Sequence, residues 1–216
     1  MTDSAAQDDR EQTLVFIGDS ITAADRDGAD PNDLGRGFVA FIADDLRRRL
    51  PDSSFGVINR GVGGDRAADV EARWESDCLA LAPDVITLLV GVNDTWRQFD
   101  RGQENPVAEY EKDLRRMVAS ARDRTTADLV LVEPFILEVG FVTDRWREDL
   151  AERREAVARV ARDAGASLVS TQYAFDGAAG ADPAALLYDG VHPTAAGHHL
   201  LAERWLAERP VTVGGS

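Results

Sequence analysis

Short apolar runs alternate with longer segments of helical periodicity along almost the whole chain, and this alternation restricts the possible folds more than any other feature. Five runs rich in Val, Ile, Leu and Phe have the near-continuous hydrophobicity of strands that are buried on both faces. Between them, apolar residues return every three or four positions, as on one face of an α-helix. Repeated strand–helix alternation predicts a parallel sheet with helices on both faces, an α/β three-layer sandwich. The predicted strands are residues 13–17, 56–59, 84–90, 129–133 and 167–170.

Helices are predicted at residues 37–50, 66–81, 107–124, 145–164 and 195–207. The last one begins after Thr194, whose hydroxyl can accept a hydrogen bond from the first helical turn and so act as an N-cap. A chain of 216 residues fits one domain of ordinary size. Because no break in composition interrupts the alternation, we expect a single domain over residues 13–209. A disordered acidic tail is expected at 1–12 and a flexible tail at 210–216.

The charge balance is strongly acidic, with 24 basic against 39 acidic residues and a formal net charge of −15. Recognition of nucleic-acid phosphates and docking on an anionic membrane both depend on clustered Lys and Arg, so neither partner is expected. Residues 1–12 lack the basic and apolar regions of a secretory signal. No apolar run approaches the ~20 residues that a membrane-spanning helix needs. We therefore expect a cytoplasmic protein.

Two details of the composition leave alternatives open or exclude a class of site. Lys112 is the only lysine, and 26 of the acidic residues are Asp. This pattern favours either a surface adapted to high salt, where screening relieves self-repulsion, or a codon bias toward Arg, Ala and Asp. Cys78 is the only cysteine, which excludes an intramolecular disulfide and a Cys-rich metal site. We expect Cys78 to be a small buried hydrophobic residue.

Glycines and polar side chains follow three of the predicted strands, and a fourth segment of this kind lies near the C-terminus. Gly18-Asp19-Ser20 follows the first strand, Gly61-Val62-Gly63-Gly64-Asp65 the second and Gly91-Val92-Asn93-Asp94 the third. The fourth segment is Asp189-Gly190-Val191-His192. In parallel α/β sheets, ligands bind beyond the carboxyl ends of the strands. We therefore expect the four segments to meet at one edge of the sheet.

Ser20, His192 and Asp189 are the residue types from which a nucleophilic site can be built. A serine hydroxyl needs a base that accepts its proton, and the base needs a carboxylate that fixes its tautomer. Asp189 precedes His192 by three residues in a glycine-containing loop and can fold back onto the imidazole. His198 and His199 lie one turn into the last predicted helix, and they are interpreted as packed or partly exposed helix residues. Ser20 taken alone could also be a helix cap.

Gly64 and Asn93 are candidate donors for a developing negative charge. In acyl transfer the former carbonyl oxygen becomes negative, so N–H groups must already point at it. A glycine in a tight turn offers its backbone N–H without a side chain in the way, and a short amide at a strand end is another usual donor. Asn93 could instead be an Asx-turn residue. A nucleotide site is disfavoured because no P-loop motif occurs and Arg66 breaks the G-x-G-x-x-G spacing.

Taken together, and in this order over residues 18–193, the four segments resemble the four sequence blocks of the SGNH hydrolases, also called GDSL esterases. The resemblance implies a flavodoxin-like sandwich with strand order 2-1-3-4-5. It implies that Ser20 is the nucleophile, His192 the general base and Asp189 the residue that orients His192. Gly64 and Asn93 would then complete an oxyanion hole with the Ser20 backbone N–H. No metal and no organic cofactor are implied, and the Gly-x-Ser-x-Gly elbow of ordinary α/β-hydrolases is absent.

Within that family the chain looks most like the small intracellular acetyl-xylan esterases. This closer resemblance implies deacetylation of carbohydrates such as xylo-oligosaccharides, and a homo-oligomer. The chain departs from the branch at Ala23-Ala24, where bulkier or polar residues are expected. Trp96 could stack on a sugar face or be a core tryptophan, and Asp19 and Asp65 are possible substrate-binding or supporting residues. The segments that carry the resemblance are Asn59-Arg60-Gly61, Arg73-Trp74, Asn93-Asp94-Thr95-Trp96-Arg97 and Glu133-Pro134-Phe135.

The sequence therefore predicts a serine esterase that hydrolyses short acyl esters through an acyl-enzyme on Ser20. Two alternatives stay open at this point. A lysophospholipase or thioesterase of the same family would need an apolar groove for a long acyl chain. A non-catalytic carbohydrate-binding module is disfavoured because Ser20, Asp189 and His192 are all present.

Overall fold

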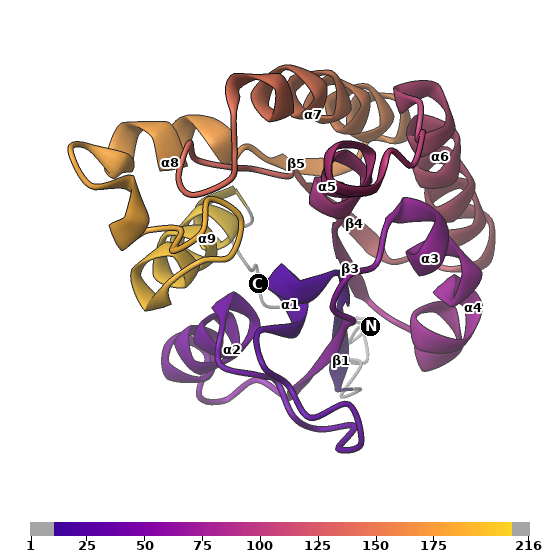
Figure 1. The fold of residues 1–216 in the computed structure, drawn as a ribbon. Helices are drawn as coiled ribbons and strands as arrows, with labels where there is room; N and C mark the ends of the chain where they lie inside the picture. The colour runs from indigo at the N-terminus through magenta and orange to yellow at the C-terminus, as the bar shows by residue number, and fades with distance from the viewer. Residues whose placement is uncertain (1–10, 209–216) are drawn as a thin grey trace, which may run out of the picture.

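Five parallel strands form one sheet in the computed structural model, which describes residues 11–208 (Figure 1). The strand order is β2-β1-β3-β4-β5, and each neighbouring pair runs parallel. Helices cover both faces of the sheet, so the predicted fold class and strand order are confirmed. Each strand overlaps its predicted range. The strands are β1 (Gln12–Gly18), β2 (Phe55–Gly61), β3 (Val85–Leu89), β4 (Asp128–Val132) and β5 (Ser167–Val169).

Four of the predicted helices are confirmed almost to the residue, because each has an apolar face that packs on the sheet. In the second of them, residues 107–124, the side chains of Leu114, Met117 and Ala121 recur on the buried side. The last begins as predicted after Thr194, whose Oγ1 accepts a hydrogen bond from the Gly197 N–H at 3.3 Å. These helices are α2 (Phe38–Arg49), α6 (Val107–Arg124), α7 (Asp144–Ala164) and α9 (Ala195–Glu208).

The prediction of one helix over residues 66–81 is wrong. The segment forms α3 (Ala67–Ala72), α4 (Trp74–Asp77) and the 3₁₀ turn η1 (Leu79–Leu81). At the first break Arg73 has φ −110° and ψ 8°, and its guanidinium donates to the carbonyl oxygens of Gly18 and Arg60. The apolar residues on both sides of the break still enter one core, which explains why their periodicity reads as a continuous helix. Cys78 belongs to that core and is fully buried, as predicted.

Several short elements were not predicted, because their sequences lack a clear apolar period. Helix α5 (Val92–Arg101) begins directly after β3, in a segment expected to be a loop. It starts at Gly91, whose φ of 134° is rarely adopted by other residues, and a Cβ there would lie 2.7 Å from the Tyr110 hydroxyl oxygen. The other unpredicted elements are α1 (Ser20–Ala23), α8 (Gln172–Ala179) and the 3₁₀ turn η2 (Pro183–Ala185).

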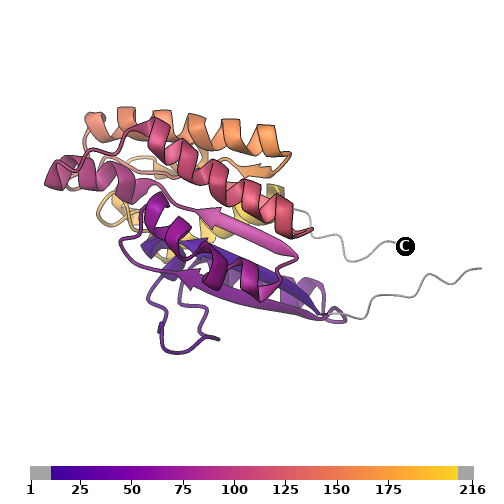
Figure 2. The ribbon, with the colours of Figure 1, turned by 90° about the vertical axis from the view of Figure 1, so that its right-hand side faces the viewer.

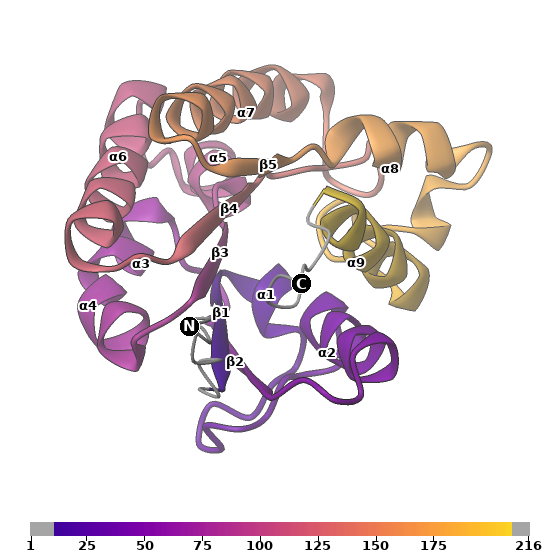
Figure 3. The same cartoon turned by 180° about the vertical axis from the view of Figure 1, so that it is seen from behind.

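Alternate residues of the central strand enter two separate cores, one on each face of the sheet. Leu14 and Phe16 of β1 pack into the core beneath α2 and α9, whereas Val15 and Ile17 pack into the core beneath α3 and α6. Figure 3 shows α2 and α9 side by side on the first face. Figure 2 shows the long helices α6 and α7 lying together on the second. This two-sided burial explains the near-continuous hydrophobicity of the strands.

The predicted tails fall almost wholly outside the described residues. Of the N-terminal tail only Glu11 and Gln12 are described, and Gln12 already begins β1. The C-terminal tail at 210–216 lies beyond the described chain, so both tails and the single domain over 13–209 stay predictions. Within residues 11–208, no helix is both long and apolar enough to cross a bilayer.

A buried guanidinium joins α7 to the segment that follows β3. Arg153 of α7 is fully buried and is paired with Asp149, one turn earlier, at 2.9 Å. Its Nε also donates to Thr95 Oγ1 at 3.1 Å, and its Nη2 donates to the Asn105 carbonyl at 2.8 Å. The guanidinium carbon lies 5.3 Å from the ring centroid of Tyr110. Helix α5, which begins at the sheet edge, is thereby tied to the outer layer.

We predict that Arg153→Ala lowers the free energy of unfolding by about 3–5 kcal/mol, because the partners of a buried cation are left without it. Urea titrations at neutral pH measure this loss. Arg115→Ala is the matched control, since Arg115 is an exposed arginine paired with Glu111 and Asp163, and it should cost less than about 1 kcal/mol. Equal losses in the two variants would contradict the role assigned to Arg153.

Candidate active site

The four polar segments meet at the carboxyl edge of the sheet, as predicted. β1 ends at Gly18, and Ser20 is the first residue of α1, with Asp19 as its N-cap. Asn93 lies in the first turn of α5, directly after β3. His192 stands just before α9, in the loop that the helix cap Thr194 closes. The sheet topology thus brings together residues that are up to 172 positions apart in the chain.

Ser20, His192 and Asp189 form one hydrogen-bonded chain. Ser20 Oγ lies 3.0 Å from His192 Nε2, and His192 Nδ1 lies 2.7 Å from Asp189 Oδ2. The second carboxylate oxygen of Asp189 accepts the backbone N–H groups of Val191 at 2.9 Å and of His192 at 2.7 Å. Both oxygens are therefore held in place, and the imidazole cannot turn without losing its carboxylate.

The electrostatics of Asp189 favour its ionised form. Burial alone would raise the pKa of this carboxyl, but the hydrogen bonds from the His192 ring and from the backbone of His192 and Val191 outweigh burial and leave the pKa below its usual value. An ionised Asp189 accepts the Nδ1–H of His192. The lone pair on Nε2 then faces Ser20 Oγ, which is the arrangement a general base needs.

Three N–H groups beside Ser20 are available to a ligand. The backbone N–H groups of Ser20 and Gly64 have no hydrogen-bond partner among residues 11–208. Gly64 has a φ of +88°, a conformation that favours glycine at this position. Asn93 is 3% exposed and uses one amide hydrogen on the Asp65 carbonyl oxygen at 3.0 Å, which leaves its second hydrogen free. The arrangement can stabilise an oxyanion.

Arg73, which is not among the predicted site residues, ties the loops of this edge together. Its guanidinium donates to the Gly18 carbonyl at 2.9 Å, the Arg60 carbonyl at 2.8 Å and Asp65 Oδ2 at 2.7 Å. The ends of β1 and β2 and the loop that carries Gly64 are therefore fixed to one another. Asp65 is thus a supporting residue, because its carboxylate and its carbonyl oxygen are both engaged within the protein.

Two buried carboxyls lie directly behind Ser20 and Asn93. Asp19 is fully buried and accepts the Ile21 N–H through Oδ1, while its Oδ2 has no partner among the described residues. Burial raises its pKa to about 7, helped by the nearby Asp94. Asp94 is also fully buried, and burial raises its pKa to about 6 despite hydrogen bonds from Ala67 and Asn105. Both carboxyls are closed off from the surface, and this burial favours a supporting role for Asp19 over a substrate-binding one.

Aromatic rings flank the imidazole of His192. Trp96 lies 5.8 Å away between ring centroids and belongs to a cluster with Phe141 and Trp146. Trp96 is partly buried there, which matches the packing interpretation of this residue. Tyr188, not selected from the sequence, stacks on His192 at 5.7 Å with an interplanar angle of 17° and is 61% exposed. Its only sequence signal is its position next to Asp189.

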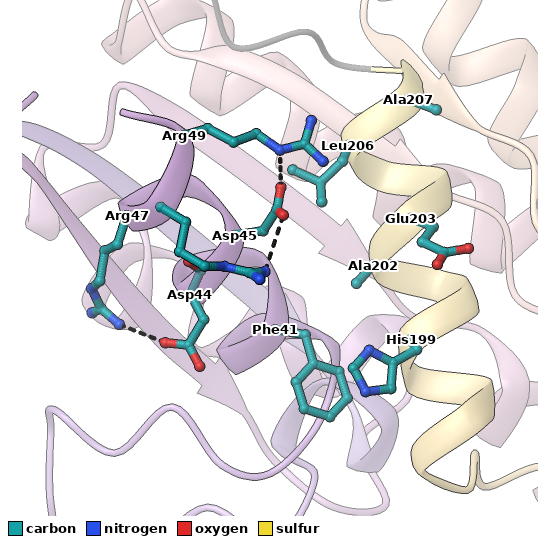
Figure 4. Close-up of a pocket in the computed structure, with 11 residues that line it drawn as sticks. Phe41, Asp44, Asp45, Arg47, Arg49, His199, Ala202, Glu203, Leu206 and Ala207 are labelled. Carbon is teal, nitrogen blue, oxygen red and sulfur yellow. Dashed lines mark hydrogen bonds and ion pairs between the residues drawn. The ribbon is translucent and has the colours of Figure 1, made fainter. Parts of the chain in front are cut away.

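A cavity of about 430 Å³ opens beside Ser20 and His192, and it is lined further by Asp25, Tyr188 and His198. A larger hollow of about 900 Å³ lies between α2 and α9 (Figure 4). There Phe41 stacks on His199, with centroids 3.9 Å apart, and none of the predicted site residues lines it. Among residues 11–208, no group of three His, Cys, Asp or Glu side chains is arranged to hold a metal ion.

Both a family model and a characterised relative match this chain over most of its length. A model of the GDSL-like Lipase/Acylhydrolase family matches residues 16–200. An acetylxylan esterase from Geobacillus stearothermophilus is 34% identical over 206 residues, which cover 91% of this chain and 93% of the esterase.

Solved structures agree with this match. A structure of an acetylxylan esterase from Geobacillus stearothermophilus superposes with a TM-score of 0.84, at 34% identity and with 91% and 93% of the two chains covered. A candidate GDSL-like lipase from Parabacteroides merdae gives 0.89 at 31% identity, covering 92% and 95%. An alpha/beta hydrolase enzyme from the metagenome of Lake Arreo, Spain, gives 0.84 at 34% identity, covering 91% and 94%.

The buried Asp19 predicts a stability that falls as the pH rises. The unfolded chain releases this proton near pH 4, whereas the native protein keeps it until about pH 7. The native state therefore binds more protons over this interval, and its stability decreases with increasing pH. In Asp19→Asn, which keeps the cap on Ile21, that decrease should be smaller. The difference in unfolding free energy, variant minus wild type, should therefore rise by roughly 2–4 kcal/mol from pH 4 to pH 8.

Unfolding free energies of both proteins from pH 4 to pH 9 measure this difference. Asp33→Asn serves as the control, because Asp33 is a partly exposed Asx-turn residue whose pKa is lowered by the backbone N–H groups of Asp27 and Gly35. Parallel curves for Asp19→Asn and the wild type would contradict the prediction.

Proposed function

The chain belongs to the GDSL-like lipase/acylhydrolase family and is a carboxylic-ester hydrolase, and on this premise we propose that it deacetylates carbohydrates through an acyl-enzyme on Ser20. The observation that carries the proposal is the chain of contacts from Ser20 Oγ to His192 Nε2 at 3.0 Å and from His192 Nδ1 to Asp189 at 2.7 Å. This is the geometry of a nucleophile, its base and the carboxylate that orients the base.

In the first half of the reaction, His192 Nε2 takes the proton of Ser20 as Oγ attacks the ester carbonyl carbon. The oxyanion is stabilised by the N–H groups of Ser20 and Gly64 and by the Asn93 amide. The bond to the alcohol oxygen then breaks, and the His192 proton goes to that oxygen as the alcohol leaves. Asp189 keeps the imidazole in the right tautomer and stabilises its positive charge meanwhile.

In the second half, His192 takes a proton from water while the water oxygen attacks the acyl-enzyme. The same N–H groups stabilise the second oxyanion, and the proton returns to Ser20 Oγ as the carboxylic acid leaves. The sum is ester plus water to acid plus alcohol, and every proton is handled by His192. No step uses a metal or an organic cofactor.

The substrate class is supported by the relatives and by the chemistry of the cavity. The chain is 34% identical to an acetylxylan esterase along 91% of its length. The solved variants of that kind of esterase include a serine-to-alanine and an aspartate-to-alanine change, each named a catalytic mutant. Acetylated sugars are neutral, so a protein with a net charge of −15 meets no repulsion in binding them.

The remaining expectations about the molecule stay predictions. The cytoplasmic location stays an expectation from the sequence, and the homo-oligomer follows only from the resemblance to the intracellular acetyl-xylan esterases. The most exposed large hydrophobic groups that an interface could cover are Tyr173, Tyr188 and Phe141, at 89%, 61% and 45% exposed. No nucleic acid and no membrane is proposed as a partner.

We predict that Ser20→Ala removes hydrolysis of 4-nitrophenyl acetate to less than about 10⁻³ of the wild-type rate, because no nucleophile remains. Its thermal unfolding should be unchanged or nearly so, since the Ser20 hydroxyl has no partner other than His192 in the part of the chain that the structure describes. An organophosphonate that labels the wild type on Ser20 should leave the variant unlabelled. Turnover close to the wild-type rate in the variant would refute the assignment of the nucleophile.

A second prediction concerns the acyl group. With 4-nitrophenyl esters from acetate to octanoate, kcat/KM should be highest for acetate and fall at least tenfold by octanoate. The same preference should hold when acetylated xylo-oligosaccharides are compared with lysophospholipids. A preference for octanoate, or for the lipids, would favour the lysophospholipase or thioesterase alternative instead.

A further inference from the structure

The cavity beside Ser20 is larger than an acetyl group requires, and one part of its wall is a buried histidine. At about 430 Å³ it extends from Ser20 and His192 to the first turn of α9, where His198 lines it. His198 is 8% exposed and was interpreted from the sequence only as a helix residue. The Gly64 and Asn93 donors are not among its lining residues. Gly63, the neighbour of Gly64, and the exposed Arg36 do line it, and the cavity opens directly beside the base His192.

The ring of His198 is held in one orientation. Its Nδ1 accepts the backbone N–H of Phe38 at 3.2 Å, at the N-terminus of α2. A Cβ on Gly37 would lie 2.6 Å from His198 Cε1 and 2.8 Å from Nδ1, so this edge of the ring is packed against the backbone of Gly37. The edge left for the cavity is the one that carries Nε2, which has no hydrogen-bond partner among residues 11–208.

The Phe38 contact also decides the tautomer. A backbone N–H can only donate, so Nδ1 must be the unprotonated nitrogen and Nε2 must carry the hydrogen. Burial lowers the pKa of His198 to about 4, which keeps the ring neutral at the pH where an ester hydrolase of this type works. His198 is thus a fixed, uncharged donor whose direction does not change with pH above about 5.

A second lining residue, Asp25, offers an acceptor and lies in an unusual backbone turn. Ala24 and Asp25 both have positive φ, at 42° and 62°, although neither is glycine. The turn rests on two glycines, because a Cβ on Gly35 would lie 2.4 Å from the Ala23 carbonyl oxygen and one on Gly61 2.1 Å from the Ala23 nitrogen. It holds the exposed Asp25 at the cavity. Strain of this kind persists where the surroundings fix it, often at ligand sites.

We propose that this cavity is the subsite for the alcohol half of the ester, that it takes a hydroxyl-bearing alcohol such as a pyranose, and that the His198 Nε2–H and the Asp25 carboxylate bind its oxygens and hydroxyls. The inference rests on the proposed function and adds to it the residues, His198 and Asp25, that would determine which alcohol is accepted. The alcohol oxygen must lie beside His192, because His192 protonates it as it leaves, and the cavity opens beside this residue. A sugar hydroxyl both donates and accepts, so it matches a cavity whose lining offers both a neutral donor and a carboxylate.

His198 also has a structural role as the cap on Phe38, and two substitutions separate the two roles. In His198→Asn the side-chain oxygen takes the place of Nδ1 and can still accept the Phe38 N–H, but nothing reaches the place of Nε2. In His198→Gln the amide reaches the place of Nε2 and can donate into the cavity, while the acceptor for Phe38 is lost. His199→Asn is the matched control, since His199 is exposed and stacks on Phe41 in the other hollow.

The experiment compares two acetyl esters that differ only in the alcohol: methyl β-xylopyranoside carrying one acetyl group, and 4-nitrophenyl acetate. The readout is the ratio of kcat/KM for the xyloside ester to kcat/KM for 4-nitrophenyl acetate, which cancels any loss of correctly folded enzyme. We expect the ratio to fall about tenfold in His198→Asn, mainly through a higher KM, because one hydrogen bond to the sugar is missing. It should return to within about threefold of the wild type in His198→Gln, although that variant melts at a lower temperature.

Each outcome decides the proposal. A ratio unchanged in His198→Asn, or lost only in His198→Gln, would show that His198 acts as a helix cap alone and would overturn the subsite while leaving the proposed function intact. A wild-type protein that hydrolyses 4-nitrophenyl acetate but not the xyloside ester would overturn both the carbohydrate substrate and the subsite. Asp25→Asn, which suits the positive φ, should also lower the ratio. An unchanged ratio there would remove Asp25 from the subsite.

Discussion

The close approach of three strand ends is the constraint on which the rest of the molecule depends. The register pairs Gly18 of β1 with Gly61 of β2 on one side and with Leu89 of β3 on the other. A Cβ on Gly18 would lie 2.0 Å from the Leu89 carbonyl oxygen, so the central strand can end there only as glycine. Because the strands are parallel, the residues that follow them leave the sheet at one level. The segments of Ser20, Gly64 and Asn93 therefore start close together, and the Asn93–Asp65 and Arg73 contacts then fix them.

This crowding has an electrostatic cost that the surrounding residues partly offset. The edge contains the buried carboxyls of Asp19 and Asp94, whose pKa values are both raised by burial. Arg73 and Arg153 lie on either side of this edge and bind carbonyl oxygens as well as carboxylates. Each guanidinium group connects separate loops through N–H donors spread over a rigid planar fork, a geometry that the compact ammonium group of a lysine does not have. Holding hydrogen-bond donors in place before the substrate arrives lowers the stability of a fold. In this protein the cost arises from the burial of the Asp19 and Asp94 carboxyls.

The sequence predicts the architecture well because burial on both faces makes each strand a visible apolar block. It also predicts that Ser20, Asp189 and His192 come together, since motifs at strand ends must meet at one edge. What it does not predict depends on contacts between distant elements. Arg73 reads as a position within a continuous amphipathic helix, and α5 lacks an apolar period because Asn93, Asp94 and Thr95 are buried through polar contacts. The sequence indicates only an ordinary helix residue at His198, because the contact that fixes its ring is the hydrogen bond from the Phe38 N–H, 160 positions earlier.

Helix α9 connects the chemistry with the recognition of the alcohol. Its cap, Thr194, follows the loop that holds His192, and His198 lies one turn further on, bound to the start of α2. A shift of α9 along α2 would therefore move the base and the cavity donor together rather than one at a time. On the outer side of the same two helices, Phe41 and His199 stack within the larger hollow. The packing between α2 and α9 thus sets how far the His192 imidazole lies from the groups of His198 and Asp25 that would bind the alcohol. The contacts that fix the base therefore also fix the position of the alcohol.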